Sequence, residues 1–351
     1  MSRHAVTILG AGAMGSALVS PLVDGGHDVR LWGTWLDDQI VAALRRGAVH
    51  PGTKAPVPTV GRVFAATELA EALDGADIVL MAVTSEGLDP VFRRAVPHLR
   101  AGQTVVTVAK GFFKEPDGRV VLLPTLLANL LPAGLRDTPI VAVGGPSKAV
   151  EVGLRVPTAV SYACREVAVA RRIRDLFATK FYFIEPSDDI VGLEICAALK
   201  NVYAIGLGIC EGFRQGRGAP HNNTKSALFQ VAVEEMAFIC ETAGGRAASA
   251  LGLPVTGDLE ITGEAGRNRV LGELIGGGMT AAAAVAHMRE RGQTVEGYPA
   301  ADLGWQYCRQ LGLTDAELPL FGALHRILYE SAEAYDRILE ALSLRYPKHS
   351  V

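Results

Sequence analysis

The segment ILGAGAMG, residues 8–15, constrains the fold of this chain more than any other stretch. Gly10, Gly12 and Gly15 have the spacing G-x-G-x-x-G, between a β-like run and a helical one. The first glycine permits a tight turn, the second lets a pyrophosphate approach the backbone, and the third allows close helix–strand packing. The N-terminus of the following helix also attracts phosphate. We therefore predict that Gly10, Gly12, Ala13, Met14 and Gly15 hold the phosphates of a dinucleotide.

The pattern of apolar residues divides the chain into two parts. Up to about residue 188, short β-branched runs alternate with helical patterns, which predicts an α/β, Rossmann-like, doubly wound parallel sheet over residues 1–188. After EPSDD (185–189) only helical patterns remain, separated by glycine-rich turns, and residues 189–351 are expected to form an all-α domain. The predicted strands cover 5–12, 28–33, 76–85, 103–111, 139–145, 158–162 and 181–184. The predicted helices cover 13–25, 36–46, 67–73, 87–99, 119–131, 164–179, 190–209, 223–243, 246–251, 267–275, 280–291, 299–311 and 317–341.

Composition excludes several classes of protein. A net charge of −3 gives no sign of a nucleic-acid or anionic-membrane surface, and the apolar runs are strand-sized. The N-terminus lacks the apolar core of a signal peptide, so we expect a cytoplasmic protein. The cysteines predict neither a disulfide framework nor a metal site. They are scattered along the chain as Cys164, Cys196, Cys210, Cys240 and Cys308.

The cofactor that the glycine loop would bind stays open between NAD and NADP. The second strand, VRLWG, ends without the acidic residue that would bind the ribose 2′-hydroxyl of NAD. No arginine follows directly for a 2′-phosphate; Thr34 and Trp35 come next, and then Asp37 and Asp38.

Lys200 interrupts an apolar helical stretch, EICAALKNVYAIGLG (194–208), and a lysine at that depth needs a partner or a chemical role. Asp258 and Thr262 are four residues apart and would share one helix face. Arg267 and Asn268 precede another apolar-periodic run; with Asn268 as N-cap, Arg267 would lie at a helix start suited to phosphate.

Each of these residues also has a purely structural interpretation. Lys200 could pair without catalysing, the GRNR segment (266–269) could be a solvated turn, and Asp258 could cap a turn.

Lys110 follows a predicted strand at its carboxyl end, where doubly wound sheets place their ligands. Together with a dinucleotide fold, these residues favour a dehydrogenase.

The sequence resembles the bacterial type of NAD(P)-dependent glycerol-3-phosphate dehydrogenase over nearly the whole chain. The resemblance rests on motifs whose order and spacing are specific. They are GAGAMG (10–15), AKG (109–111), GPSKAVEV (145–152), VGLEICAALKNVYAIGLG (191–208), NTKSAL (223–228), GDLEIT (257–262), GRNRVLGELIGGG (266–278), VEG (295–297) and ELPLFGALHRILY (317–329).

The resemblance implies a catalytic site between a Rossmann domain and a helical domain. Lys200 would be the general acid/base, and Lys110, Asp258 and Thr262 would surround the reacting carbon. Arg267 and Asn268 would hold the phosphate of sn-glycerol 3-phosphate or dihydroxyacetone phosphate. The remaining roles implied are Asn201 beside the substrate, and Glu296, Lys110 and Arg267 near the cofactor. The partners implied are a small phosphorylated substrate, neither nucleic acid nor membrane, and a second copy in a homodimer, which apolar helical surface also favours.

The sequence departs from the family pattern at three places. Met14 stands where the family usually has an aromatic residue, and the segment GAGAMGS resembles ketopantoate reductases equally well. Val231 stands where the family usually has an arginine. The turn GFRQGRGAPHNN (212–223) is longer than in the family, and we expect it near the substrate mouth. These departures leave two alternatives: a dehydrogenase of a longer polyol phosphate or of a 2-keto acid, and a non-catalytic NAD(H)-binding protein.

Overall fold

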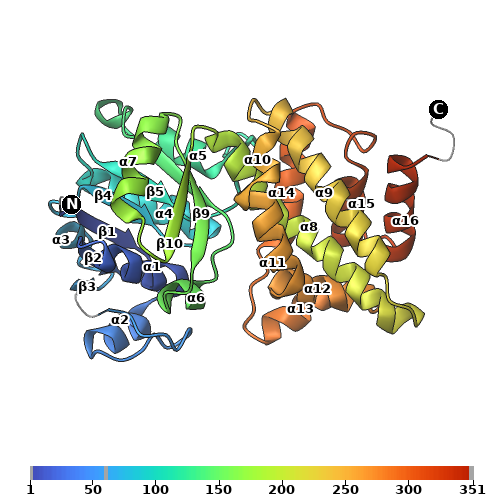
Figure 1. Ribbon diagram of the computed structural model, residues 1–351, viewed down its shortest axis with the longest axis horizontal. Coiled ribbons are helices and arrows are strands. Elements are labelled where there is room, and N and C mark those ends of the chain that lie inside the picture. The colour runs from blue at the N-terminus through green and yellow to red at the C-terminus, as the bar shows by residue number, and fades with distance from the viewer. Residues whose placement is uncertain (1–2, 59–61, 348–351) are drawn as a thin grey trace. The chain divides into compact units, whose positions relative to one another are not determined.

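The computed structural model describes residues 3–58 and 62–347, and these form two compact units. The first unit comprises residues 1–110 and 123–194, and the second comprises residues 111–122 and 195–351. The expected boundary after residue 188 therefore differs from the observed one, which falls between Glu194 and Ile195. Figure 1 draws the first unit mainly in blue to green and the second mainly in yellow to red.

The first unit is built on an eight-stranded sheet, which confirms the predicted α/β class. The strand order is β10-β9-β8-β5-β4-β1-β2-β3. All neighbours are parallel except β8 and β9, and β3 was missed by the sequence patterns because it has only three residues. The strands are β1 (Ala5–Leu9), β2 (Asp28–Trp32), β3 (Arg62–Phe64), β4 (Ile78–Met81), β5 (Thr104–Thr107), β8 (Ile140–Gly144), β9 (Thr158–Ala163) and β10 (Tyr182–Ser187).

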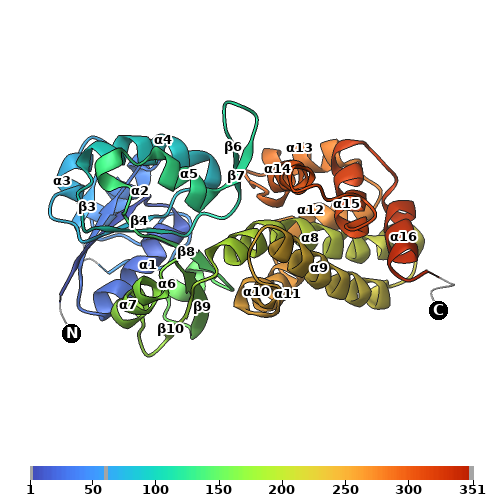
Figure 2. The same cartoon turned by 90° about the horizontal axis from the view of Figure 1, so that it is seen from above.

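Helices cover both faces of this sheet, which explains why central strands such as β4 are apolar throughout. Figure 2 shows α1 (Ala13–Asp24), α6 (Ala149–Gly153) and α7 (Val167–Phe177) on one face. The other face carries α3 (Leu69–Leu73), α4 (Ser85–Ala95) and α5 (Leu123–Leu130), and α2 (Asp38–Arg45) follows β2.

The second unit is predominantly helical, as the sequence predicted. The expected helix over 317–341 is two helices, separated by a turn in which Ser331 has a positive φ of 57°. The helices are α8 (Ile190–Arg217), whose first residues belong to the first unit, α9 (Asn222–Thr242), α10 (Ala248–Leu251), α11 (Asp258–Glu264), α12 (Arg267–Gly276), α13 (Ala281–Glu290), α14 (Gly297–Gln310), α15 (Pro319–Tyr329) and α16 (Ala334–Arg345).

Helix α8 runs through the core of this unit. Among the described residues it is the one helix with the length and apolar composition of a membrane span. Its most apolar window is 94 % buried inside the structure, as in the core helix of a soluble protein.

A β-hairpin from the first half of the chain also belongs to the helical unit. Its strands are β6 (Phe112–Lys114) and β7 (Val120–Leu122), where the sequence patterns predicted the end of a strand and the start of a helix. The backbone N–H of Val120 donates to the Gln310 side chain at 2.7 Å, and the Gln310 amide donates back to the Val120 carbonyl at 3.0 Å. Because Gln310 ends α14, the hairpin is bonded to a helix made much later in the chain.

Helices α8 and α12 approach each other so closely that glycine is required on both. A Cβ at Gly272 of α12 would lie 2.0 Å from the Ile205 carbonyl oxygen of α8, and one at Gly208 of α8 would lie 2.2 Å from the Arg269 carbonyl oxygen. Backbone therefore meets backbone along this seam, which fixes α12 against the helix that carries Lys200.

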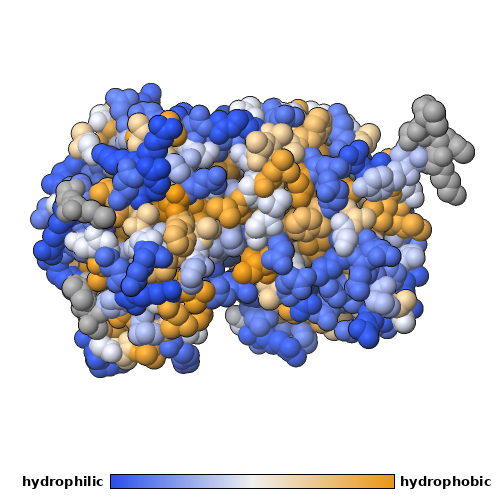
Figure 3. Space-filling model, in the orientation of Figure 1, coloured by the Kyte–Doolittle hydropathy of each residue, from blue (hydrophilic) through white to orange (hydrophobic). Residues whose placement is uncertain are grey.

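The segment 212–223 is not the long turn near a substrate mouth that we expected. Helix α8 continues to Arg217, and only residues 218–221 connect it to α9. At 1.5 Å per residue, Arg217 lies roughly 26 Å along the helix from Lys200. The Arg217 guanidinium instead lies 3.6 Å from the Tyr335 ring centroid, and hydrophilic residues cover this end of the unit (Figure 3). The extra residues therefore lengthen a helical hairpin and do not border Lys200.

Candidate active site

The loop after β1 has the geometry of a phosphate cradle. Gly10 has a φ of 114°, which favours glycine, and a Cβ at Gly15 would lie 2.0 Å from the Gly10 carbonyl oxygen. At Gly12 no heavy atom of the residues that the structure describes, chain neighbours apart, lies within 4 Å of the Cβ position, so a ligand can approach the backbone there. Ala13 and Met14 open helix α1 directly behind the loop. The residues present therefore fit a dinucleotide pyrophosphate at this helix start.

Asp37 supports this loop from the end of β2. One oxygen of its carboxylate accepts hydrogen bonds from the backbone N–H and hydroxyl of Thr34, at 2.8 and 2.9 Å, and from the Ala11 N–H at 3.3 Å. The Asp37 carboxylate, which follows β2, is thus hydrogen-bonded to the protein's own backbone and side chains. Sequence reasoning noticed Asp37 but gave it no role, because nothing in the sequence indicates which way it points.

His50 also contacts the same loop residue, Ala11. Its Nδ1 accepts from the backbone N–H groups of Gly52 and Thr53, both at 3.1 Å, so the ring proton belongs on Nε2. Nε2 then donates to the Ala11 carbonyl at 3.2 Å. Its position in a loop with no periodic pattern gave no signal of this contact.

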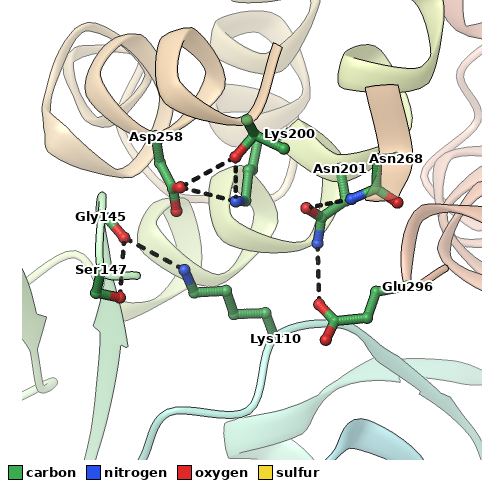
Figure 4. Close-up of polar contacts among 9 residues, drawn as sticks. Lys110, Gly145, Ser147, Lys200, Asn201, Asp258, Asn268 and Glu296 are labelled. Atoms are coloured by element: carbon green, nitrogen blue, oxygen red, sulfur yellow. Dashed lines mark hydrogen bonds and ion pairs between the residues drawn. The ribbon is translucent and has the colours of Figure 1, made fainter. Parts of the chain in front are cut away.

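Lys110 lies in the first unit, just after β5, as expected from the sequence. Its Nζ donates to the Gly145 carbonyl at 3.3 Å, and the Ser147 hydroxyl donates to the same oxygen at 3.4 Å (Figure 4). Gly145 follows β8, so two neighbouring strand ends contribute to this contact. A cation therefore occupies the carboxyl edge of the sheet, where such folds bind ligands.

Glu194 is a buried acidic residue that the sequence patterns did not single out. It is fully buried, and neither carboxyl oxygen has a hydrogen-bond partner. Burial raises its pKa to about 8, and the positive charge of Lys110 acts in the opposite direction. At neutral pH the side chain is consequently a neutral acid.

Lys200, Asp258 and Thr262 come together in the second unit. The Lys200 ammonium donates to the Asp258 carboxylate at 2.7 Å (Figure 4). It also donates to the Thr262 hydroxyl at 2.8 Å. The side chains of Lys200 and Asp258 are only 8 % and 4 % exposed. An ammonium held this firmly by a carboxylate is suited to deliver or accept a proton at a fixed position.

The local backbone places Asp258 and Thr262 on one face of α11, as their spacing predicted. The Thr262 hydroxyl donates to the Asp258 carboxylate at 3.3 Å across one helical turn. A π-helical turn, Leu253–Gly257, precedes α11, and such turns are frequent at functional sites.

Next to this cluster, Asn201, Asn268 and Glu296 form a second polar group. The Asn201 amide donates to Glu296 at 3.4 Å, and its oxygen accepts from the Asn268 amide at 2.9 Å (Figure 4). Asn268 also accepts from the backbone N–H of Gly297 at 2.9 Å. The prediction that Asn268 is the N-cap of α12 is wrong: Gly266 has that position, and Asn268 turns inward to join α8 to α14.

Arg267 is the first residue of α12, and its side chain remains accessible. It is 51 % exposed, and its guanidinium lies 3.8 Å from the Glu296 carboxylate. At the start of α12 it lies beside the backbone N–H groups of the first turn, which have no partner within the helix. This arrangement can bind a phosphate.

A second buried glutamate, Glu235 in α9, has a different environment. It accepts hydrogen bonds from the Tyr203 hydroxyl at 2.8 Å and from the backbone N–H groups of Leu320 and Phe321 at 2.7 and 2.9 Å. Burial raises its pKa to about 7, against these hydrogen bonds. Glu235 therefore caps the start of α15.

Val231, on the same helix, is 1 % exposed and packs in the core where the family pattern has an arginine.

Comparison with known proteins assigns the whole chain to one family. Residues 5–170 match the model of the NAD-dependent glycerol-3-phosphate dehydrogenase N-terminus, and residues 189–338 match that of its C-terminus. An NADP(+)-dependent glycerol-3-phosphate dehydrogenase of Archaeoglobus fulgidus is 35 % identical over 97 % of this chain and 99 % of its own length. A glycerol-3-phosphate dehydrogenase [NAD(P)+] of Anaeromyxobacter dehalogenans is 36 % identical, covering 97 % and 98 %. The crystal structure of glycerol-3-phosphate dehydrogenase from Coxiella burnetii has a TM-score of 0.82 at 28 % identity, covering 97 % of this chain and 99 % of that one. The chain belongs to the NAD-dependent glycerol-3-phosphate dehydrogenase family.

Proposed function

We propose that this protein interconverts sn-glycerol 3-phosphate and dihydroxyacetone phosphate with NAD(H) or NADP(H). The observation that carries the proposal is the buried Lys200 ammonium, held at 2.7 Å by Asp258 and at 2.8 Å by Thr262. Family membership supports the same activity. The test is the loss of reduced-nicotinamide absorbance when dihydroxyacetone phosphate is added, and a folded protein without this activity would refute the proposal.

In this proposal Lys200 carries the proton transfer. A reduced nicotinamide, when bound, supplies the hydride. Lys200 donates a proton from Nζ to the ketone oxygen as negative charge develops there, a contribution typically worth ~10²–10⁴ in rate. Asp258 and Thr262 fix Nζ and stabilise its charged form, and Lys110 stabilises the developing oxyanion. In the reverse direction Lys200 accepts the hydroxyl proton.

Arg267 and the first turn of α12 hold the substrate phosphate in this proposal. The phosphate fixes one end of the substrate, so that binding energy away from the reacting carbon helps to orient the carbonyl. Asn268 has a different role, because its amide joins Asn201 and Gly297 and so sets the position of α12.

Replacing Arg267 with alanine should weaken phosphate-bearing substrates selectively. Loss of one charge-assisted hydrogen bond costs roughly 1.5–3 kcal/mol, or ~10–150-fold in kcat/KM for dihydroxyacetone phosphate. The rate with unphosphorylated dihydroxyacetone should change little. The matched control is Arg269→Ala, since Arg269 pairs with Glu273 at 3.0 Å within the same helix. An equal loss for both substrates, or for both variants, would refute the phosphate role.

We propose that NADP(H) is preferred over NAD(H), and the loop after β2 supports this. Asp37 is turned inward toward Thr34 and Ala11, so it does not oppose a 2′-phosphate as an outward carboxylate would. Trp35 is 44 % exposed, and the Arg94 guanidinium lies 5.2 Å from its ring centroid. The similar enzyme from Archaeoglobus fulgidus is NADP(+)-dependent. These observations support a 2′-phosphate contact from Arg94.

NADPH is accordingly expected to be the better reductant, and Arg94→Ala should reduce the ratio of kcat/KM for NADPH to that for NADH by ~10–100-fold. The neighbouring Arg93 gives the control, because it pairs with Asp89 at 2.9 Å; Arg93→Ala should keep the ratio. Steady-state rates with both cofactors measure it. A ratio unaffected by Arg94→Ala would exclude this arginine as the discriminating group.

We further infer a cytoplasmic homodimer. The inference rests on apolar helical surface in the second unit, of which Leu339 and Leu344 of α16, 53 % and 54 % exposed, are examples. Sedimentation velocity tests the dimer, and a monomer at micromolar concentration would contradict it.

A further inference from the structure

Two buried cysteines of the helical unit lie together although they are far apart in the sequence. Cys196 belongs to α8 and Cys240 to α9, and these two helices lie side by side (Figures 1 and 2). Both residues are fully buried reduced thiols, and their sulfur atoms are 3.5 Å apart. A disulfide bond requires the sulfur atoms to approach to about 2.0 Å. A small movement of one helix end is therefore enough to join them.

Cys240 lies where a helix opens most easily. It is in the last turn of α9, which ends at Thr242, and a glycine with a φ of 84°, Gly244, follows directly. Helix ends open and close locally at a small cost in free energy, so a thiol in the last turn meets solvent while the rest of the protein stays folded. A small oxidant such as hydrogen peroxide can therefore react with Cys240, whereas Cys196 stays in the core.

The oxidation of this pair balances with one molecule of hydrogen peroxide. The Cys240 thiolate attacks the O–O bond, which gives a sulfenic acid and the first water. When the last turn of α9 closes, the sulfenic sulfur lies against the Cys196 thiol. The Cys196 sulfur then displaces the sulfenic hydroxyl, which leaves with the thiol proton as a second water, and the S–S bond forms. Both thiols are oxidised, the peroxide is reduced, and a dithiol reagent reverses the change.

The new bond would act on Lys200 and Asp258 from two directions. Cys196 comes four residues, or about one helical turn, before Lys200 in α8. The chain that leaves Cys240 continues through α10 to α11, which begins with Asp258. Drawing the sulfur atoms together by about 1.5 Å therefore shifts the helical segments that hold Lys200 and Asp258 in contact at 2.7 Å.

We propose that Cys196 and Cys240 form an oxidation site, at which hydrogen peroxide creates a reversible disulfide that slows the turnover of dihydroxyacetone phosphate. Disulfides in cytosolic proteins are usually transient and redox-sensing, which fits a bond of this kind. The effect on turnover rests on the proposed function, whereas the formation of the bond does not.

The bond itself is measured by tryptic peptide mapping without reduction, after treatment with a small molar excess of hydrogen peroxide and blocking of the remaining thiols. Each of the five cysteines falls on a different tryptic peptide, so a linked pair of peptides identifies the bond. We expect residues 181–200 joined to residues 226–246, in a product that dithiothreitol removes. Peroxide-treated protein without this product would overturn the proposal.

Turnover of dihydroxyacetone phosphate by the same sample should fall by up to ~10²-fold, because a displacement of about 1 Å at a catalytic group has an effect of this size. Dithiothreitol should restore it. The KM for NADPH should stay the same, since the glycine loop belongs to the first unit. Cys240→Ala removes the thiol that reacts first, so its turnover should resist peroxide. Cys196→Ala cannot form the bond either and serves if Cys240→Ala does not fold.

Cys210→Ala is the matched control. Cys210 lies in the same helix as Cys196 and is also buried, and burial raises its pKa to about 12, so it does not provide the thiolate that reacts with peroxide. This variant should form the bond and lose turnover as the unmodified protein does. Full turnover in the linked protein, or an equal loss in Cys240→Ala, would overturn the proposal. If the reduced protein does not oxidise NADPH with dihydroxyacetone phosphate, the proposed function fails, and the linked peptides still decide whether the oxidation site exists.

Discussion

Replacing Lys200 with alanine is expected to lower turnover of dihydroxyacetone phosphate by ~10²–10⁴-fold. The loss follows because Lys200 is the group that Asp258 and Thr262 hold in place for proton transfer. NADPH should still bind, since the glycine loop belongs to the first unit. Steady-state rates and quenching of protein fluorescence by NADPH measure the two effects separately.

Two further variants distinguish chemistry from folding in this experiment. Lys200→Ala removes the ammonium that pairs with the buried Asp258 carboxylate, and breaking a buried ion pair in this way costs about 3–5 kcal/mol in proteins. The double variant Lys200→Met with Asp258→Asn removes both charges, so it should recover stability but not activity. Lys225 forms ion pairs with Glu211 and Glu264 at 2.7 and 2.8 Å, and Lys225→Ala should retain turnover. Substantial activity in Lys200→Ala would refute the assignment of the general acid.

Replacing Gly272 with alanine should have a large effect on the fold. The added Cβ would lie 2.0 Å from the Ile205 carbonyl oxygen, and this contact is with backbone that cannot rotate away. Helices α8 and α12 must separate, and overpacking of this kind costs about 1–3 kcal/mol or more. Because α12 carries Arg267, a displacement of about 1 Å relative to Lys200 can also lower activity ~10²-fold. Urea unfolding and kcat/KM measure both consequences.

The control for this prediction is Gly134→Ala in the first unit. Apart from its chain neighbours, no described residue has a heavy atom within 4 Å of the Cβ position at Gly134, so the substitution should be neutral or slightly stabilising. If Gly272→Ala were as stable and active as the unmodified protein, the helix seam would not be what positions α12.

The parts of the structure that the sequence predicted are those with local signals. The spacing of Gly10, Gly12 and Gly15 predicts the phosphate-binding turn. Asp258 and Thr262 share a helix face because they are four residues apart. Lys200 was noticeable because a charge interrupts an apolar helix. In each case the relevant geometry extends over only a few residues, and periodicity reports it directly.

The parts that could not be predicted depend on contacts between distant residues. His50 reaches Ala11 across 39 residues of sequence, and nothing around either residue indicates it. Asn268 is a residue type that often caps helix starts, but its side chain instead donates to Asn201 and accepts from the Gly297 N–H. Nothing in the sequence around Gly272 indicates a contact, whereas the close approach of α12 to α8 requires a glycine there. Tertiary contacts outweighed local preference at each of these positions.

The hairpin of β6 and β7 cannot reach its final structure until a much later part of the chain has been translated. The backbone N–H of Val120 donates to Gln310, which is translated 190 residues later. At ~5–20 residues per second, that interval lasts roughly 10–40 s on the ribosome. A lone two-stranded hairpin is marginally stable in water, so this segment spends the interval without its support. The helical unit is thus completed only when α14, made 190 residues later, binds this hairpin.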